Sequence, residues 1–492
     1  MNKKNEQYVV VAGLGRSGSS IARFLKLKGE KVIATDINPL KSYMAAELES
    51  SGIITEIGFH STETFENAKK IIVSPGIPLN SKYLRIAAKK GVPVTGELDL
   101  TAEFIDIPII AITGTNGKTT VTTLISEMLQ VSGFRVFTGG NIGTPLVNYL
   151  MGDEKADIIV AEVSSFQLDT AKKFSPDVAV LLNISEDHID RYRDFTAYTE
   201  SKWSIFAHQQ KGSVAIINNG IKGVEKRVEN LKSMPVFFTM QGLKKGCKGA
   251  IIKHDKIIIR NNANSPGFNH YLSESLWKNS GDNLNKALDG NLNKDMAVDS
   301  FTHTDMTIDI LKYGLKGSHN RENIAAASLA CLAVGGSIKG VETIVKSFKG
   351  LSHRIEYAGT INGVDYIDDS KATNPDAVIK AIECFENNII LILGGRSKKT
   401  NFICMKEAVR TRVKKIIILG ESKKEINNAF SGICDVLSAD SMEQAVDIAV
   451  AIALKGDIVL LSPACASFDL YESYAARGND FVENVKMHMD NI

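Results

Sequence analysis

Short apolar runs that alternate with helix-like stretches constrain the fold of this chain more than any other feature. The runs are rich in Val and Ile, and Gly, Asn, Asp or Pro bounds each of them. Continuous apolarity predicts strands that are covered on both faces, as in parallel sheets with helices on either side. We therefore predict an α/β fold. Examples of the predicted strands are residues 8–12, 31–35, 71–74, 108–113, 157–163, 178–183, 389–393, 415–419 and 457–462.

The length of the chain and three glycine-marked turns predict three domains. The chain has 492 residues, and single hydrophobic cores stop growing near roughly 250–300 residues. Gly13, Gly114 and Gly394 each follow a predicted strand and begin a new series of strand–helix units. We expect a Rossmann-like domain, a central P-loop ATPase domain with a mostly parallel sheet, and a second Rossmann-like domain. Their predicted ranges are residues 1–96, 97–350 and 351–492.

One central segment departs from this pattern. Residues 242–307 are dense in Asn, Lys, Ser and Gly, and their main apolar run is residues 250–259. Such a composition is typical of loops. We expect a hairpin followed by a polar insertion.

Composition and charge argue against several classes of function. The 58 basic and 56 acidic residues leave a formal charge of +2. The chain therefore has no broad positive electrostatic field to attract nucleic acid or an anionic membrane surface. The apolar runs are far shorter than the roughly 20 residues that span a bilayer, and the N-terminus carries no secretory signal pattern. The six cysteines form no CxxC pair, which argues against structural zinc and disulfides. We expect a cytoplasmic monomer without membrane insertion.

The segment TGTNGKTT, residues 113–120, is the strongest local signal and is typical of a phosphate-binding loop. Its glycines allow main-chain amides to face phosphate oxygens, a lysine reaches the outer phosphates, and a threonine hydroxyl binds magnesium. The upstream glycine of the common pattern is replaced by Ile112. A plain strand-to-helix turn would explain the glycines but not the Lys-Thr-Thr. The predicted ATP-binding residues are Gly114, Thr115, Asn116, Gly117, Lys118, Thr119 and Thr120.

Polar residues at the ends of the next two strands are candidates for magnesium ligands. Glu162 ends one strand, and His188 follows another. Ligands of α/β sheets gather beyond the carboxyl ends of strands, so Thr119 and Glu162 could hold a first magnesium ion and His188 could lie near a second. A solvated strand-end charge and a capping or packing histidine are the alternatives. Histidine is an unusual magnesium ligand.

The N-terminal turn GLGRSG, residues 13–18, permits three interpretations. Asp36 ends the next strand, as in a dinucleotide-binding unit. A nicotinamide or flavin dinucleotide, a different nucleotide such as a uridine diphosphate, and a purely structural turn all suit this geometry. The downstream phosphate loop favours a different nucleotide, such as a uridine diphosphate, at this turn. A further turn, SPGIP at residues 74–78, either lines the same crevice or is a proline-fixed turn.

Taken together, the motifs resemble those of the Mur ligase family of peptidoglycan precursor synthesis. Their order matches over nearly the whole chain, except the polar insertion. The amino-acid-site motifs are most similar to the branch of the family that adds D-glutamate to UDP-N-acetylmuramoyl-L-alanine. The motifs are GLGRSG, SPGIP, TGTNGKTT, GGNIG, EVSSFQL, NISEDHIDRY, HNREN, HRIE, DDSKATNP, the lysine after GGRS, and SPACASFD.

The resemblance implies three α/β domains that bind the UDP-sugar, ATP and the amino acid in turn. It assigns the UDP-sugar to Arg16, Ser17, Asp36, Gly76, Asn141, Ser164 and Gln167. It adds Asn320, Asn323, Arg354 and Asp369 to the ATP site. It assigns D-glutamate to Lys371, Thr373, Lys398, Ser467, Phe468 and Tyr474. Phe468 and Tyr474 replace a more usual leucine and phenylalanine, and Asn38 stands where a basic residue often lies.

The resemblance also gives Lys202 a role that its local sequence does not suggest. Lys202 occupies the position of a carbamylated lysine that holds the second magnesium with His188. Without the resemblance, Lys202 would be interpreted as a solvated helix charge. Lys371 and Lys398 would likewise be interpreted as ordinary surface charges. The predicted catalytic residues are Lys118, His188 and Lys202.

The reaction implied is ATP-dependent amide formation with ATP and two magnesium ions, and neither flavin nor nicotinamide is expected. A substrate carboxylate attacks the γ-phosphate of ATP to give an acyl phosphate, and the amine of D-glutamate then displaces phosphate. No protein nucleophile is needed. The alternatives are another Mur ligase, a folylpolyglutamate synthase-like ligase, a nicotinamide-dependent dehydrogenase, and a P-loop switch protein.

Overall fold

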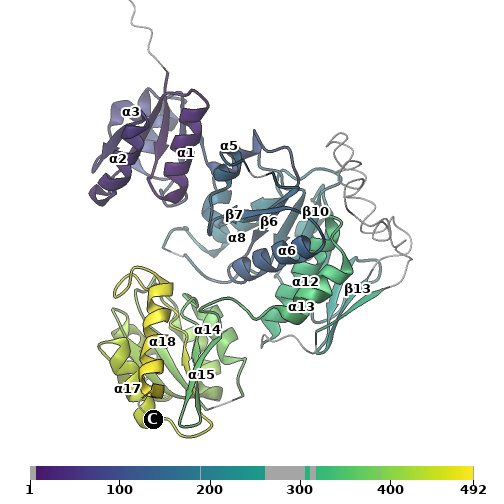
Figure 1. Cartoon of the computed structure of the whole chain (residues 1–492), viewed down its shortest axis with the longest axis vertical. Helices are drawn as coiled ribbons and strands as arrows, with labels where there is room; N and C mark the ends of the chain where they lie inside the picture. Colours follow the sequence, from purple (N-terminus) through teal and green to yellow (C-terminus); the bar gives the residue numbers. More distant parts are fainter. Residues whose placement is uncertain are drawn as a thin grey trace, which may run out of the picture. The chain divides into compact units, whose positions relative to one another are not determined.

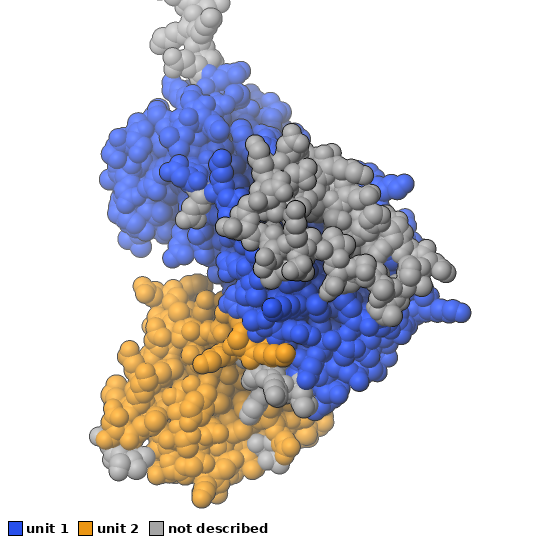
Figure 2. Space-filling model, turned by 45° about the vertical axis from the view of Figure 1, so that its right-hand side comes forward, with its two compact units in different colours: residues 1–183, 196–311, 323–345 blue, residues 184–195, 312–322, 346–492 orange. Residues whose placement is uncertain are grey.

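Three helix-flanked sheets organise the chain in the computed structural model (Figure 1), as the apolar runs predicted. The structure describes residues 7–153, 155–188, 190–260, 305–310, 317–386 and 388–490. The chain divides into two compact units, coloured in Figure 2. The first holds residues 1–183, 196–311 and 323–345, and the second holds residues 184–195, 312–322 and 346–492. None of the described helices is long and apolar enough to cross a membrane.

The first sheet has five parallel strands in the order β3-β2-β1-β4-β5. Val9 and Val11 pack under α1 on one face, whereas Val10 and Ala12 belong to a separate cluster on the other face. Both faces are therefore buried, which explains the continuous apolar runs. The strands are β1 Val9–Ala12, β2 Val32–Asp36, β3 Ile54–Ile57, β4 Lys70–Val73 and β5 Val94–Thr95. The helices are α1 Arg16–Leu27, α2 Ser42–Ser50, α3 Thr62–Glu66, α4 Lys82–Lys89 and α5 Glu97–Ala102.

The second sheet has nine strands in the order β14-β13-β12-β11-β10-β9-β6-β8-β7. Strand β6 lies between β9 and β8, all three parallel, so their carboxyl ends share one edge. The parallel strands are β6 Ile109–Thr113, β7 Val136–Gly140, β8 Ile158–Glu162, β9 Val178–Leu181, β10 Val214–Asn218, β11 Met234–Thr239 and β12 Gly249–Ile252. The helices are α6 Lys118–Val131, α7 Ser165–Leu168, α8 Phe195–Trp203, α9 Val224–Val228, α12 Ser318–Ala333 and α13 Ile338–Ser347.

The predicted hairpin is confirmed at the edge of this sheet. Strand β12 pairs antiparallel with β13 Lys256–Arg260. A further strand, β14 Met306–Asp309, pairs with β13 and was not predicted. Most of the polar insertion, residues 261–304, lies outside the described residues.

The third sheet has six strands in the order β15-β16-β20-β17-β18-β19, antiparallel only between β15 and β16. Leu391 and Leu393 face the cluster under α14, α15 and α16, whereas Ile390 and Ile392 face α17 and α18. The strands are β15 Glu356–Ile361, β16 Val364–Asp368, β17 Ile389–Gly394, β18 Val413–Leu419, β19 Asp435–Ser438 and β20 Ile458–Leu461. The helices are α14 Pro375–Ile382, α15 Lys406–Arg412, α16 Lys423–Phe430, α17 Met442–Ile452 and α18 Tyr474–Asp490.

Candidate functional site

The phosphate loop connects β6 to α6, and Asn183 holds its main chain. The amide of Thr115 donates to the carbonyl oxygen of Asn183 at 3.0 Å. The amide of Asn116 donates to Asn183 Oδ1 at 2.8 Å, and Asn183 Nδ2 donates back to the carbonyl of Asn116 at 3.0 Å. Asn183 lies two residues after the neighbouring strand β9, so the sheet order supplies this support. The sequence analysis gave Asn183 no role, and its only signal was its position at a strand end.

Gly117 brings the loop against a residue of the predicted ATP site. It is the residue before α6, with a φ of 85°, a conformation that favours glycine. A Cβ atom there would lie 2.5 Å from Oδ1 of Asn323, on α12. The structure therefore places Asn323 beside the loop. Asn320 is buried but belongs to the second unit, and its assignment to ATP stays a prediction.

Two lysines converge on the loop. Lys118 Nζ donates to the carbonyls of Gly114 and Thr115, both at 2.9 Å. Lys202 Nζ donates to the same Gly114 carbonyl at 2.8 Å. The Lys202 side chain is nearly buried, with 2% of the residue exposed, so its interpretation as a solvated helix charge is wrong. Burying an ammonium group is costly unless it has hydrogen-bond acceptors, and the Gly114 carbonyl is one such acceptor.

Helix α8 explains why Lys202 is buried. Tyr198, one turn earlier on that helix, packs on the loop, and its hydroxyl lies 3.1 Å from Thr115 Oγ1. Lys202 Nζ lies 4.7 Å from the centre of the Tyr198 ring, at a cation–π distance. The helix thus presents Tyr198 and Lys202 to the loop together. The sequence analysis did not single out Tyr198.

Glu162 is buried at the end of β8, next to the loop strand, with 1% of the residue exposed. Its interpretation as a solvated strand-end charge is therefore wrong. Oε1 accepts a hydrogen bond from Asn141 Nδ2 at 3.1 Å. Oε2 has no hydrogen-bond partner among the described residues. A buried carboxylate oxygen with a vacant lone pair suits a magnesium ion, which prefers oxygen ligands. With the Thr119 hydroxyl, Glu162 fits the predicted first metal site.

The two glycine-containing turns of the N-terminal sheet lie side by side. Ser74 Oγ donates to the carbonyl of Gly13 at 2.7 Å. Asp36 accepts from the amides of Leu14 and Asn38 at 2.7 and 2.9 Å. Asp36 thus holds the first turn through Oδ2 and the segment that follows its own strand through Oδ1. Arg16 and Gly76 are exposed on these turns, as a role in ligand binding requires.

A buried carboxylate, Glu97, lies close to predicted UDP-sugar residues from two sheets of the first unit. Glu97 Oε1 accepts from the amide of Val147 at 3.2 Å. Burial raises the pKa of Glu97, and hydrogen bonding from Val147, Ser17 and Gln167 partly opposes this shift. Gln167 also accepts from the amide and hydroxyl of Ser164, both at 3.0 Å. The sequence analysis missed Glu97, because nothing in its local sequence distinguishes it from a surface acid.

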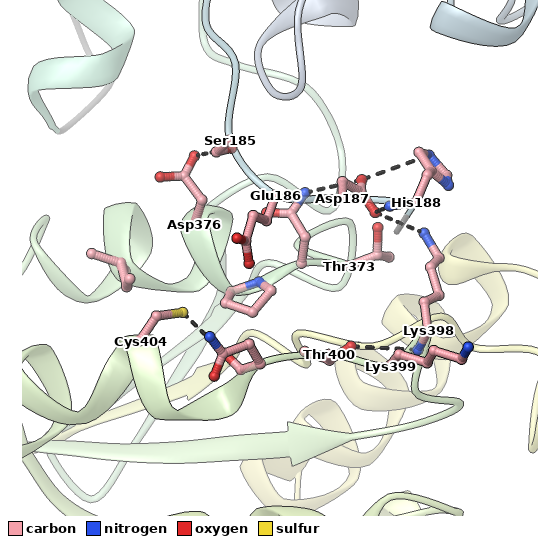
Figure 3. A pocket seen from close by; sticks show the side chains of 14 residues that line it. Ser185, Glu186, Asp187, His188, Thr373, Asp376, Lys398, Lys399, Thr400 and Cys404 are labelled. Atoms are coloured by element: carbon pink, nitrogen blue, oxygen red, sulfur yellow. Dashed lines mark hydrogen bonds and ion pairs between the residues drawn. The ribbon is translucent and has the colours of Figure 1, made fainter. Parts of the chain in front are cut away.

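A pocket of about 240 Å³ in the second unit brings His188, Thr373 and Lys398 together (Figure 3). Asp187 lies between the two basic side chains, with Lys398 Nζ at 3.3 Å and His188 Nε2 at 3.7 Å from its carboxylate. Lys398 therefore has an internal counterion here. The lining residues are Ser185, Glu186, Asp187, His188, Thr373, Asn374, Pro375, Asp376, Ile379, Lys398, Lys399, Thr400, Asn401 and Cys404.

The other residues predicted for D-glutamate lie outside this lining set. Lys371 Nζ lies 4.7 Å from the centre of the Tyr474 ring, at a cation–π distance. Ser467 is buried, whereas Phe468 is 64% exposed. The structure thus pairs Lys371 with Tyr474, one of the two residues that depart from the family pattern.

Asp369 and Arg354, both predicted for ATP, interact within the second unit. Asp369 accepts a hydrogen bond from Ser462 Oγ at 2.8 Å. Burial raises its pKa to about 7, and the Ser462 hydrogen bond and the Arg354 charge act in the opposite direction. The preceding Asp368 contacts His353 Nδ1 at 2.7 Å.

Comparisons with known proteins give matches over nearly the whole chain. Family models described as Mur ligase MurD-like N-terminal domain, Mur ligase middle domain, and Mur ligase glutamate ligase domain match residues 7–96, 112–331 and 353–465. A UDP-N-acetylmuramoylalanine–D-glutamate ligase from Desulfosudis oleivorans is 42% identical over 482 residues, 97% of this chain and 96% of that protein. The protein of that name from Desulfatibacillum aliphaticivorans is 40% identical over 96% of both chains.

A solved structure has the same fold. The MurF ligase from Thermotoga maritima in complex with ADP covers 100% of both chains, with a TM-score of 0.59 and 17% identity. Identity this low supports the fold alone. The matches to curated relatives, however, extend over nearly the full length of both chains, and three Mur ligase family models match in succession. This protein belongs to the Mur ligase family.

Proposed function

We propose that the protein joins D-glutamate to UDP-N-acetylmuramoyl-L-alanine at the expense of ATP, in cytoplasmic peptidoglycan precursor synthesis. The observation that carries the proposal is the 42% identity, over 97% of the chain, with a relative named for that reaction. We further propose that the protein acts as a monomer, that its domains meet near residues 96 and 350, and that two magnesium ions take part. The family assignment argues against the dehydrogenase and P-loop switch alternatives.

The phosphate loop and its surroundings support the first chemical step. The carboxylate of the alanyl residue attacks the γ-phosphate of ATP, ADP leaves, and negative charge spreads over the phosphoryl oxygens in the transition state. The loop carbonyls of Gly114 and Thr115 hold the Lys118 ammonium group, from where it can turn to the outer phosphates. A bound magnesium ion would neutralise further charge on these oxygens. Thr119 and Glu162 would hold it, and Lys202, if carbamylated, is a candidate ligand for a second.

The pocket of the second unit supports the amide-forming step. D-Glutamate carries two carboxylates, and Lys398 and Lys371 are the predicted partners, with Thr373 as a hydroxyl donor. Lys398 would exchange the Asp187 carboxylate for one of the substrate. His188 lines the same pocket and can accept a proton from the attacking amine. The predicted remaining contacts come from Ser467, Phe468 and Tyr474.

A phosphate-release assay tests the function. The parent protein, with ATP and magnesium, should release phosphate only when UDP-N-acetylmuramoyl-L-alanine and D-glutamate are both present. Lys118→Ala should slow release about 100- to 1,000-fold, whereas Lys222→Ala, at an exposed position of the same unit, should leave the rate unchanged. Equal rates for Lys118→Ala and the parent would contradict the role of the loop.

A panel of amino acids tests the substrate. We expect D-glutamate to support release, and L-alanine, diaminopimelate and L-lysine to fail. Release with one of these three instead would favour a different Mur ligase. Release with a folate and glutamate would favour the folylpolyglutamate synthase-like alternative.

A further inference from the structure

Arg477 is a buried cation whose hydrogen bonds go to main-chain carbonyls and a hydroxyl rather than to a carboxylate. It lies in the first turn of α18, with 2% of the residue exposed. Among the described carboxylates, none forms an ion pair with it. Burial lowers the pKa of its guanidinium to about 10, so the group keeps its charge at neutral pH. Such a charge is costly unless hydrogen-bond acceptors surround it.

The acceptors of Arg477 are three main-chain carbonyls and one hydroxyl. Nη2 donates to the carbonyl of Ser370 at 2.8 Å and to that of Cys465 at 3.2 Å. Nη1 donates to the carbonyl of Cys465 at 3.2 Å and to that of Gly394 at 3.4 Å. Nε donates to Ser370 Oγ at 3.0 Å. Every nitrogen of the guanidinium is therefore used, which a lysine could not reproduce.

These acceptors lie just beyond the carboxyl ends of three adjacent strands. Ser370 follows β16, Cys465 follows β20, and Gly394 ends β17, and these strands are consecutive neighbours in the sheet. One side chain thus connects three loops that are separate in the sequence. The loops are residues 369–374, 394–401 and 462–473.

Two glycines make room for this arrangement. A Cβ atom on Gly395, whose φ is 132°, would lie 3.1 Å from Arg477 Nη1 and 2.3 Å from the carbonyl oxygen of Ala466. A Cβ atom on Gly478 would lie 2.3 Å from His353 Nδ1 and 2.7 Å from Asp368 Oδ2. Helix α18 therefore approaches the strand ends closely at Gly478, and the guanidinium reaches the loops beside Gly395.

The three loops carry most of the residues predicted to bind D-glutamate. Lys371 and Thr373 belong to the first loop, Lys398 to the second, and Ser467 and Phe468 to the third. We propose that Arg477 is a positioning residue for the amino-acid site, because it fixes these loops relative to one another without being one of the predicted contacts. This inference rests on the proposed function, since it takes D-glutamate as the ligand of the loops.

The experiment compares Arg477→Lys with a matched arginine of the same sheet. Arg412 Nη1 also donates to main-chain carbonyls, those of Glu383 and Phe385, but it lies just before β18 begins, at the amino end of the strands. Arg477→Lys should raise KM for D-glutamate about 10- to 100-fold, the scale of a misplaced substrate. KM for ATP and for the UDP-sugar should stay within about twofold. Arg412→Lys should leave all three unchanged.

A second variant keeps the arginine and removes one acceptor. Ser370→Ala deletes the hydroxyl that accepts from Arg477 Nε and donates to the carbonyl of Tyr474 at 2.8 Å. It should raise KM for D-glutamate several-fold, and it tests the inference if Arg477→Lys does not fold. Thermal unfolding of each variant is measured alongside.

The outcomes separate the two proposals. If the parent releases no phosphate in response to D-glutamate, the proposed function is wrong. If the parent responds and the variants lose thermal stability but keep the parental KM for D-glutamate, Arg477 is only structural and the inference is overturned. Equal rises in all three KM values would overturn it as well.

Discussion

Replacing Gly117 by alanine tests the geometry of the phosphate loop most directly. The residue has a φ of 85°, and a side chain in the left-handed region costs about 1–2 kcal/mol. The new Cβ would also lie 2.5 Å from Asn323 Oδ1. Overpacking of this kind costs about 1–3 kcal/mol. We therefore expect Gly117→Ala to destabilise the first unit by about 2–5 kcal/mol, the sum of the two effects.

The chain offers a matched control in Gly223. Gly223 also precedes a helix, α9, with a φ of 78°, and nothing lies within 4 Å of a Cβ placed on it. Gly223→Ala should therefore show only the conformational cost. With about 1.5 °C of melting temperature per kcal/mol for a unit of about 320 residues, we expect a fall of about 2 °C for Gly223→Ala and about 5 °C for Gly117→Ala.

Differential scanning calorimetry of both variants, alone and combined with Asn323→Ala, completes the test. Removing the Asn323 side chain removes the closest atom and leaves Leu182 Cδ1 at 3.3 Å, so Gly117→Ala should then cost only slightly more than Gly223→Ala. Phosphate release should show a raised KM for ATP in Gly117→Ala but not in Gly223→Ala. Equal melting temperatures for the two single variants would refute the close contact between loop and α12.

Three further changes test individual charges. Glu162→Gln keeps the acceptor for Asn141 and removes a buried charge, so the melting temperature measured without metal should not fall. The magnesium concentration for half-maximal phosphate release should rise about tenfold or more, because a carboxylate ligand is lost. Lys398→Met should raise KM for D-glutamate about 10- to 100-fold, the loss of one charge-assisted hydrogen bond of about 1.5–3 kcal/mol, whereas Lys399→Met, at the next pocket position, should change it far less. The pKa of the Asp369 carboxyl is about 7 in the folded protein and 3.8 ordinarily. At a pH between these two values, the folded state keeps a proton on Asp369 that the unfolded state has lost. Its contribution to stability therefore falls as the pH rises from about 4 to 7, and in Asp369→Asn the decline of melting temperature over this range should be shallower than in the parent.

Several central strands of this protein can be predicted from the sequence, because burial on both faces leaves a continuous apolar run. Residues 108–113 and 389–393 were predicted from this pattern, and both form central strands, β6 and β17. Strand β14 was not predicted, because it lies beside the polar segment and pairs only at the sheet edge. An edge strand buries less of its surface, and its sequence carries a weaker signal.

The buried charges could not be predicted in the same way. Lys202 and Glu162 have the residue types of a solvated surface, and their local sequences say nothing of burial. The resemblance to a family, rather than any periodicity, indicated their roles. Arg477 and Glu97 received no role, because the groups that surround them come from segments far away in the chain.

The order of strands explains why distant residues become partners at the phosphate loop. Strand β6 lies between β8 and β9, so the residues that end or follow those strands, Glu162 and Asn183, flank the loop. The third sheet repeats this principle, since β20 lies between β16 and β17 and Arg477 connects the loops beyond all three. In both sheets the main-chain carbonyls at the carboxyl ends provide acceptors for a buried cation, Lys202 in one and Arg477 in the other. Strand neighbours are not encoded in local periodicity, so a motif search finds the loop that binds phosphate but not the residues that hold it in place.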